Sequence, residues 1–290
     1  MIGNKNNNDT TKLLNEKLGS EPFLIAVHRG SSMGNIIENT LPAFYAAIQS
    51  GADILEIDVV RSSDGEFYIF HDGNERRLLG QEKNIREMDS VFIESLNYRN
   101  NIGQVVNYKL EKLENVLTNL KGSGMLLNLD RSWDDWETLL PFLDQFDMAD
   151  QIILKSPVNQ SCLSILEQHP IKYPYMPIIK KLEEIDEVLS YQTINLTGME
   201  LIAKDTDSVF FQDSIIRGIK EKGLFIWLNA IVLNDKDVLY AKYDDDQSII
   251  KGPDYGWGKL IEKGCDVIQT DWPSLLNQYR QEISKKMKRG

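Results

Sequence analysis

From Pro22 to its end, the chain alternates short apolar segments with segments whose apolar residues recur at helical spacing. The stripe of Leu41, Phe44 and Ile48, at positions i, i+3 and i+7, is typical of the helical segments. The apolar segments are rich in Leu and β-branched residues and alternate little, as strands covered on both faces do. They are Phe23–His28, Asp53–Val59, Glu66–His71, Met125–Asp130, Gln151–Lys155, Tyr175–Lys180, Met199–Ala203, Leu224–Asn229 and Asp266–Thr270. This order predicts an α/β fold with a parallel sheet. With 290 residues it predicts a (β/α)8 TIM barrel.

Nine strand candidates exceed the eight places of such a barrel, so we expect one strand to be accessory. The sequence favours Tyr175–Lys180 or Met199–Ala203 for that role. Between His71 and Leu113 the chain is rich in Asn, Glu and Arg and contains no good strand. We therefore predict a small helical insertion after the third strand, at about 74–112, packed over one end of the barrel.

The remaining domain boundaries follow from polarity. Residues 1–21 form a polar leader with a short helix around Leu13–Leu18, and 22–290 form a single barrel domain. The leader lacks the apolar core of a signal peptide, so the chain as written is expected to be cytoplasmic. A secreted or lipid-anchored form without the leader stays open. No segment approaches the roughly 18 apolar residues of a membrane span, so no integral membrane segment is expected.

Charge and cysteine content exclude several classes of protein. The formal net charge is −12, whereas a nonspecific nucleic-acid binder needs a basic surface, so no nucleic-acid partner is expected. The only two cysteines, Cys162 and Cys265, lie far apart and outside any CxxC pair. This argues against a disulfide scaffold and a cysteine-based zinc site, and we expect two isolated buried thiols. The sequence leaves the oligomeric state undetermined.

Two of the three histidines end predicted strands. His28 ends the first strand and precedes Arg29-Gly30, and His71 ends the third and precedes Asp72-Gly73. In a TIM barrel this is where catalytic groups lie, and two facing imidazoles supply a base and an acid near neutral pH. The alternative is that each histidine is a hydrogen-bonded structural cap. His169, which precedes a proline in a helix-to-strand connection, is expected to be structural.

Carboxylates occupy the ends of two further strands. Glu56 and Asp58 are two residues apart on one strand and therefore project to the same side. Two buried carboxylates repel each other unless a positive charge lies between them. With Asp130 at the end of the fourth strand they form an all-oxygen set that suits one divalent cation, Mg²⁺ or Ca²⁺. The alternatives are salt bridges with Arg or Lys, and helix capping by Asp130.

These motifs follow one another in an order that resembles the glycerophosphodiester phosphodiesterase family. The residues are HRG at 28–30, ENTLPAF at 38–44, EIDV at 56–59, DG at 64–65 and HD at 71–72. Weaker similarity continues through Leu113-Glu114, WLN at 227–229 and QTDWP at 269–273, so that it spans Phe23 to Leu276. The resemblance implies a TIM barrel with a small insertion. It also implies a metal-dependent hydrolase that cleaves a small-molecule glycerophosphodiester into glycerol 3-phosphate and an alcohol.

The resemblance also implies roles for individual residues. It implies that His28 and His71 are the acid and the base, although the sequence does not tell which histidine is which. It also implies that Arg29 binds the substrate phosphate. Glu56 and Asp58 become direct metal ligands. The attacking group stays open between water and the vicinal hydroxyl of glycerol.

Two further residues belong to the implied site without a fixed role. Glu38 joins the acidic cluster, behind the metal ligands or beside substrate. For Trp227, together with Trp257, two interpretations stay open: the indoles line the alcohol side of the pocket, or both tryptophans only pack.

The fourth strand departs from the family pattern. Where the family tends to have NIELK, this chain has NLDRS at 128–132. Asp130 therefore replaces a glutamate, as in the related phospholipase-D-type toxins, and Ser132 replaces a phosphate-binding lysine. We expect Lys155, at the end of the fifth strand, to supply the missing cation.

Two other functions remain open. A phospholipase D-like or lysophospholipid-specific enzyme would need an apolar groove near the barrel mouth, and the insertion is too polar to suggest one. A phosphate-binding barrel without turnover would be favoured by loss of a histidine or of the Glu56/Asp58 pair, and none is lost.

Overall fold

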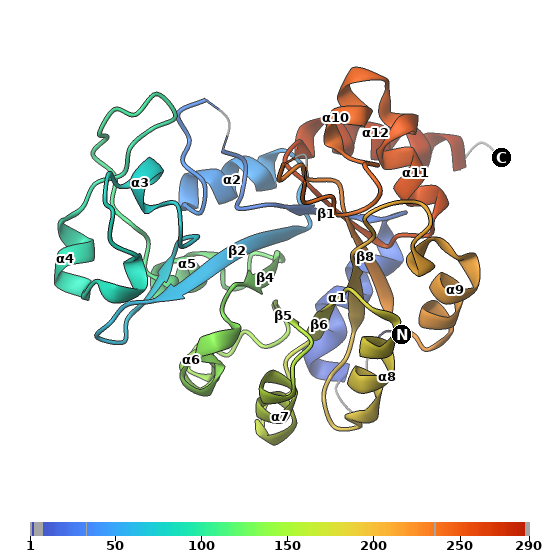
Figure 1. Ribbon diagram of the computed structural model, residues 1–290, viewed down its shortest axis with the longest axis horizontal. Helices are drawn as coiled ribbons and strands as arrows, with labels where there is room; N and C mark the ends of the chain where they lie inside the picture. The colour runs from blue at the N-terminus through green and yellow to red at the C-terminus, as the bar shows by residue number, and fades with distance from the viewer. Residues whose placement is uncertain (1, 3–7, 33, 235, 288–290) are drawn as a thin grey trace.

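A closed barrel of parallel strands forms the centre of the molecule (Figure 1). The computed structural model describes residues 2, 8–32, 34–234 and 236–287. Neighbouring strands pair in parallel around the ring, and the pairing of the first with the second closes it, which confirms the predicted TIM barrel. The eight strands are β1 (Leu24–Val27), β2 (Ile54–Arg61), β4 (Leu126–Asp130), β5 (Ile152–Pro157), β6 (Tyr175–Ile179), β7 (Gly198–Leu201), β8 (Phe225–Asn229) and β9 (Val267–Thr270).

Helices surround the ring and bury their apolar stripes against the outward face of the strands. Phe44 and Val116 are fully buried in this way, in one continuous core with the outer residues of the strands. The helix that contains Phe44 begins after Thr40, whose hydroxyl accepts a hydrogen bond from the Ala43 amide. The outer helices are α2 (Leu41–Gln49), α5 (Leu113–Leu120), α6 (Trp136–Asp144), α7 (Gln160–Gln168), α8 (Leu182–Ser190), α9 (Asp213–Glu221), α10 (Asp245–Ile250), α11 (Trp257–Glu262) and α12 (Pro273–Met287).

The accessory strand is not the one expected. Tyr175–Lys180 and Met199–Ala203 contain β6 and β7, which both belong to the ring. The strand outside it is β3 (Phe67–Ile69), which pairs antiparallel with the last residues of β2. A turn around Gly65 joins the two strands, and so short a connection allows only an antiparallel hairpin, because a parallel pair needs a crossover of a dozen residues or more.

The segment after β3 forms the predicted helical insertion. It contains α3 (Glu75–Leu78), a 3₁₀ turn at Ile85–Glu87 and α4 (Ser90–Ser95), and lies to the left of the barrel in Figure 1, along the part of β2 that extends past the ring. Buried residues such as Tyr68, Tyr98 and Phe70 give it an apolar cluster of its own.

Helix α1 (Asn8–Ser20) lies at the amino ends of the strands and is longer than the helix expected around Leu13–Leu18. Its Leu14 is fully buried among the first inward-facing residues of the barrel, which include Leu24 and Val267. The Thr10 hydroxyl donates to the Lys172 carbonyl at 2.9 Å. The part of the expected leader at 1 and 3–7 lies outside the described residues. Among the described residues, no helix has the length and apolarity that crossing a membrane would require.

Candidate active site

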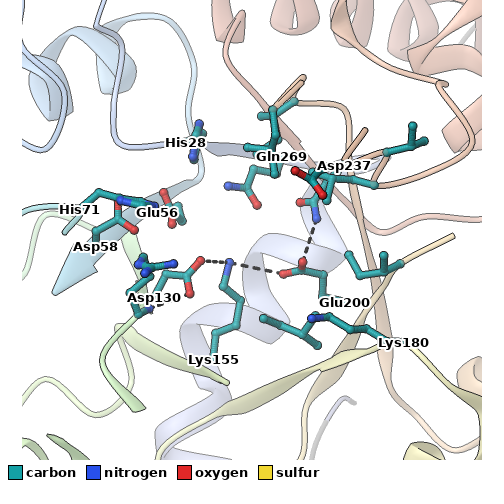
Figure 2. A pocket seen from close by; sticks show the side chains of 18 of the residues that line it. His28, Glu56, Asp58, His71, Asp130, Lys155, Lys180, Glu200, Asp237 and Gln269 are labelled. Carbon is teal, nitrogen blue, oxygen red and sulfur yellow. Dashed lines mark hydrogen bonds and ion pairs between the residues drawn. The ribbon is translucent and has the colours of Figure 1, made fainter. Parts of the chain in front are cut away.

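A pocket of about 770 Å³ opens at the carboxyl ends of the strands, where TIM barrels place their active sites. Figure 2 shows side chains from many strands directed into it. The sequence-predicted residues that line it are His28, Arg29, Glu56, Asp58, His71, Asp130 and Lys155. The closure of the barrel brings these residues together from five strand ends, because β1 and β2 stand beside each other and β4 and β5 follow around the ring.

Three carboxylates form the floor of one side of the pocket. Glu56, Asp58 and Asp130 each offer an oxygen within 4.8 Å of the other two. Asp58 and Asp130 are register partners on neighbouring strands, which explains why their side chains meet. The Arg29 amide donates to Glu56 Oε2 at 2.9 Å, and Asn39 Nδ2 donates to Asp58 Oδ2 at 2.8 Å. In Glu56 and in Asp58, protein donors therefore bind one carboxylate oxygen and leave the second oxygen for a ligand.

The negative charge of this cluster is only partly neutralised by the protein. Arg29 Nε lies 2.9 Å from Asp58 Oδ2, and Lys155 Nζ lies 2.5 Å from Asp130 Oδ2. Salt bridges, one of the two alternatives to a metal, are thus present for these two acids, whereas Glu56 has no cationic partner at ion-pair distance among the described residues. Burial first, and then the neighbouring Asp58, raise the pKa of Glu56 to about 8. The buried, uncompensated oxygen set fits a hard divalent cation such as Mg²⁺ or Ca²⁺.

Both histidines are fixed through Nδ1. His28 Nδ1 lies 3.0 Å from Asp271 Oδ1, and His71 Nδ1 lies 2.7 Å from the Asp72 carbonyl oxygen. A carbonyl oxygen only accepts hydrogen bonds, so Nδ1 of His71 carries the proton and Nε2 of a neutral His71 is left with its lone pair. Burial opposes charge on His28, but the hydrogen bond that His28 donates to Asp271 and the nearby charge of Glu56 outweigh it and raise the pKa of His28.

Salt bridges fix Asp72, the residue that follows His71. Asp72 Oδ1 accepts hydrogen bonds from Nε and Nη2 of Arg131 at 3.0 and 2.9 Å. Arg86, from the insertion, lies 3.4 Å from the other Asp72 oxygen and 2.8 Å from Asp135. The insertion therefore helps to fix the backbone that orients His71.

Arg29 is held in a strained but well-supported position. Its φ of 55° lies in the left-handed region, and the next residue, Gly30, also has positive φ. A Cβ at Gly30 would lie 2.7 Å from the Ala43 carbonyl carbon, so only glycine fits where the β1 loop meets α2. Arg29 Nη1 donates to Glu38 at 3.0 Å, and Arg77 binds the same Glu38 oxygen at 2.8 Å. Glu38 thus orients Arg29 and lies outside the carboxylate trio.

Lys155 is almost fully buried in the middle of the pocket floor. Besides Asp130, it faces Glu200 Oε2 at 3.4 Å. Burial disfavours the charged ammonium, but Asp130, Glu200 and Glu56 together raise the pKa of Lys155. Figure 2 shows the ammonium between the two acids. Lys155 lies where it was predicted, although two carboxylates already bind it.

Trp227 and Trp257 are not among the residues that line the pocket, which favours the packing alternative over the alcohol-side one. Trp227 is fully buried below Lys155 and donates to Asn229 and Gln269 at 3.0 and 3.1 Å. Trp257, the first residue of α11, is also buried and donates to Asp245. For both indoles the packing alternative is correct, because each N–H finds its partner inside the protein.

Sequence reasoning missed three acidic residues that support the site. Asp271 binds His28 across the junction of β9 with β1. Glu200, at β7, binds Lys155 and accepts a hydrogen bond from Asn229 at 2.8 Å. Asp245 accepts hydrogen bonds from the Thr270 hydroxyl and the Asp271 amide and so fixes the end of β9. Only Asp271 had a signal in the sequence, as part of the QTDWP segment at 269–273.

Comparisons with solved structures give a consistent picture of the fold. A glycerophosphoryl diester phosphodiesterase from Parabacteroides distasonis superposes with a TM-score of 0.74 at 17% identity, covering 93% of this chain and 92% of that one. A phosphodiesterase from Oleispira antarctica, solved in complex with the product sn-glycerol-3-phosphate, gives 0.65 at 20% identity and covers 89% of this chain and 96% of its own.

Curated relatives point to the same class. A glycerophosphodiester phosphodiesterase of Bacillus altitudinis is 25% identical over 273 residues, 89% of this chain and 98% of that protein. The uncharacterized protein YqiK of Bacillus subtilis is 28% identical over 148 residues, 49% of this chain and 60% of that protein. A glycerophosphodiester phosphodiesterase of Arabidopsis thaliana is 46% identical over 55 residues, 19% of this chain and 14% of that protein. The chain spans less than two thirds of the length of the last two relatives.

A family model described as a domain of unknown function matches residues 175–280, from β6 into α12. The likeness to glycerophosphodiester phosphodiesterases that the strand-end motifs predict is confirmed by the solved structures and the curated relatives together.

Proposed function

We propose that this protein is a metal-dependent phosphodiesterase that hydrolyses glycerophosphodiesters to glycerol 3-phosphate and an alcohol. One observation carries the proposal: two histidines, each fixed through Nδ1, stand beside a buried trio of carboxylates at the mouth of a TIM barrel. The likeness to glycerophosphodiester phosphodiesterases supports the same enzyme class.

Glu56, Asp58 and Asp130 are the residues that would hold the cation. When bound, a divalent cation neutralises the carboxylates and polarises a non-bridging oxygen of the substrate phosphate. Without such a charge, the acidic floor would repel a phosphodiester anion.

Two cationic side chains then position the phosphate. Arg29 uses Nη1 and Nε for Glu38 and Asp58, and Nη2 has no hydrogen-bond partner among the described residues. That nitrogen is the donor available to a phosphate oxygen. Lys155 supplies the second positive charge from the opposite side and so replaces the lysine that is missing at position 132. The residue at that position is Ser132, whose hydroxyl accepts a hydrogen bond from buried Trp136. Fixed donors of this kind stabilise the negative charge that develops on the transition state.

The partners of the two histidines suggest how they divide the proton transfers. The carboxylate of Asp271 stabilises an imidazolium at His28, which suits the acid that protonates the leaving alcohol oxygen. The neutral carbonyl partner of His71 leaves Nε2 as an acceptor, which suits the base that deprotonates the attacking hydroxyl. Either water or the vicinal hydroxyl of glycerol serves as attacker in this scheme.

The test is turnover of glycerophosphocholine and glycerophosphoethanolamine, each with Mg²⁺, with Ca²⁺ and with EDTA. Release of glycerol 3-phosphate, measured by a coupled dehydrogenase, is expected with a cation and absent in EDTA. Release of the phosphorylated alcohol instead would place the cleavage on the other side of the phosphorus and contradict the proposal.

A lysophospholipid is the second candidate substrate, because the pocket has an apolar wall. The wall does not come from the insertion. The ends of β6, β7 and β8 form it and contribute Ile178, Ile202 and Ile231. Lysophosphatidylcholine in the same assay tests it.

A further inference from the structure

The outer half of the pocket carries lysines that the chemistry at the carboxylate trio does not use. Lys180, Lys204 and Lys236 line the pocket on the side opposite to the two histidines and follow β6, β7 and β8 respectively. Figure 2 shows the Lys180 side chain reaching toward the centre of the pocket. The chain as a whole has a net charge of −12, so a gathering of lysines at one wall is unlike its average surface.

Two of the lysines follow isoleucines of the apolar wall closely in the sequence. Lys180 comes two residues after Ile178, and Lys204 two residues after Ile202. All four of these residues line the pocket, and the two lysines are more exposed than the two isoleucines that precede them. A ligand that extends outward from the phosphate site therefore passes the isoleucines and then meets the lysines.

These lysines are free to bind a ligand, whereas the nearby acids are engaged. Within the described part of the chain, no ion pair or hydrogen bond holds the ammonium groups of Lys180, Lys204 and Lys236, and all three residues are exposed. The two aspartates at this wall stabilise their own loops: Asp205 accepts from the Asp207 amide at 3.0 Å, and Asp237 accepts from Asn234 Nδ2 at 2.7 Å.

We propose that this lysine wall, Lys180, Lys204 and Lys236, binds a second anionic group on the alcohol part of the substrate. The preferred substrates are then glycerophosphodiesters whose alcohol carries a phosphate or a comparable anion. The inference rests on the proposed function and names its substrate class.

The same wall disfavours the other alcohols. A cationic headgroup such as choline would lie against three ammonium groups whose charge Asp205 and Asp237 only partly offset, and it would be repelled. The acyl chain of a lysophospholipid would leave the isoleucines only to meet charged lysine heads, where it gains no burial.

The experiment compares two substrates that differ by one phosphate: glycerophosphoinositol and glycerophosphoinositol 4-phosphate. Wild-type kcat/KM is expected to be about tenfold higher for the phosphorylated substrate and to lose this advantage at high salt. The triple variant Lys180→Gln/Lys204→Gln/Lys236→Gln should lower kcat/KM for the phosphorylated substrate roughly tenfold, with roughly twofold for each lysine, and change the neutral one about twofold or less.

A matched triple variant controls for net charge. Lys12→Gln/Lys222→Gln/Lys285→Gln removes the same three charges from exposed positions that do not line the pocket, and should leave both substrates unchanged. Equal kcat/KM for the two substrates in the wild type, or an equal loss for both in the lysine-wall variant, would overturn the inference. So would a preference for lysophosphatidylcholine, which would assign the outer half to an acyl chain.

Calorimetric titration separates this inference from the proposed function. In a His71→Asn background, which limits turnover, glycerophosphoinositol 4-phosphate should bind about tenfold more tightly than glycerophosphoinositol, and the triple lysine-wall variant should abolish the difference. If neither compound is hydrolysed by the wild type, the proposed function fails, while the binding difference still decides whether the lysine wall recognises the anion. Equal affinities for both compounds would overturn the inference.

Discussion

The two halves of the barrel mouth differ in chemistry although the same strand–loop pattern builds both. On the side of β1 to β4, the strand ends carry acids and histidines that are buried or half-buried and fixed by hydrogen bonds. On the side of β6, β7 and β8, isoleucines are followed by exposed lysines without partners among the described residues. Lys155, on β5, lies between the halves and binds acids from both, Asp130 and Glu200.

Under the two proposals made above, this difference separates the groups that react from the groups that recognise the alcohol. A reacting group must be held within a fraction of an ångström, which requires burial and several partners. A recognition group for a variable alcohol can remain exposed and flexible, because only its charge has to reach the ligand. Changes in the first half should therefore act mainly on kcat, and changes in the second mainly on the choice of substrate.

Loss of the cation site should have the largest effect. Chelation with EDTA, or Glu56→Gln, is expected to lower turnover by about 10³-fold or more, because Arg29 and Lys155 alone, each already paired with an acid, do not replace the charge of the cation. Added Mg²⁺ or Ca²⁺ should restore the chelated wild type but not the variant. Full activity in EDTA, with metal analysis showing no bound ion, would show that the trio is only a salt-bridged cluster.

The histidines come next. His28→Asn and His71→Asn should each lower kcat roughly 10²–10⁴-fold, the usual contribution of a positioned proton-transfer group. The two losses should not multiply in the double variant, since the groups act as a unit. His169→Ala is the control: this histidine binds Asp144 at 3.1 Å, far from the pocket lining, and steady-state kinetics should show no change. If both asparagine variants fold by circular dichroism and turn over normally, the strand-end histidines are structural caps.

Lys155→Met tests the role of the lysine that lies between the two halves. Removing this cation leaves Asp130 and Glu200 facing each other and takes a positive charge from the phosphate site, so kcat/KM should fall about 10²-fold. Lys222→Met, at an exposed position outside the pocket, is the matched control. Comparable, small effects of the two substitutions in a kinetic assay would make Lys155 a structural counter-ion only.

Asp271→Asn should have a smaller effect, with a distinct pH signature. The substitution keeps a hydrogen-bond acceptor near His28 but removes the charge that helps to raise the pKa of that imidazole. If His28 is the acid, activity falls as pH rises through its pKa, so the variant's alkaline limb should move to lower pH, with kcat down roughly tenfold at pH 7.5. An unchanged pH profile of kcat would mean that Asp271 does not tune His28.

Leu14→Ala should leave the chemistry of both halves intact. Leu14 closes the amino end of the barrel, and its truncation should destabilise the fold by roughly 2–5 kcal/mol through lost burial and a cavity. We expect a lower melting temperature with unchanged kcat and substrate preference below the transition. A change in substrate preference would show that the bottom of the barrel is coupled to its mouth.

How far the sequence predicted the site depends on which contacts form it. Glu56 with Asp58, and His28 with Arg29, are neighbours along one strand, and strand geometry alone places them together. The barrel and most of its strands were likewise predictable, because alternating apolar segments and amphipathic helices determine a parallel sheet. The sequence left the role of Trp227 open, because it does not show whether an indole N–H finds a partner inside the protein, as that of Trp227 does.

Local order in the chain thus determined the fold class, the strand-end motifs and the chemistry that they favour. The short turn around Gly65 is also a local feature, and it forces β3 to pair antiparallel with β2. Tertiary structure decided how the ring closes. It also decided the partners across the ring: Asp271 and His28 are 243 residues apart in sequence and meet only because β9 pairs with β1. Barrel closure likewise brings the lysines of β6 to β8 to face the acids of β2 and β4 across one pocket. No local pattern encodes such a distance, since it follows from the closure of the whole ring.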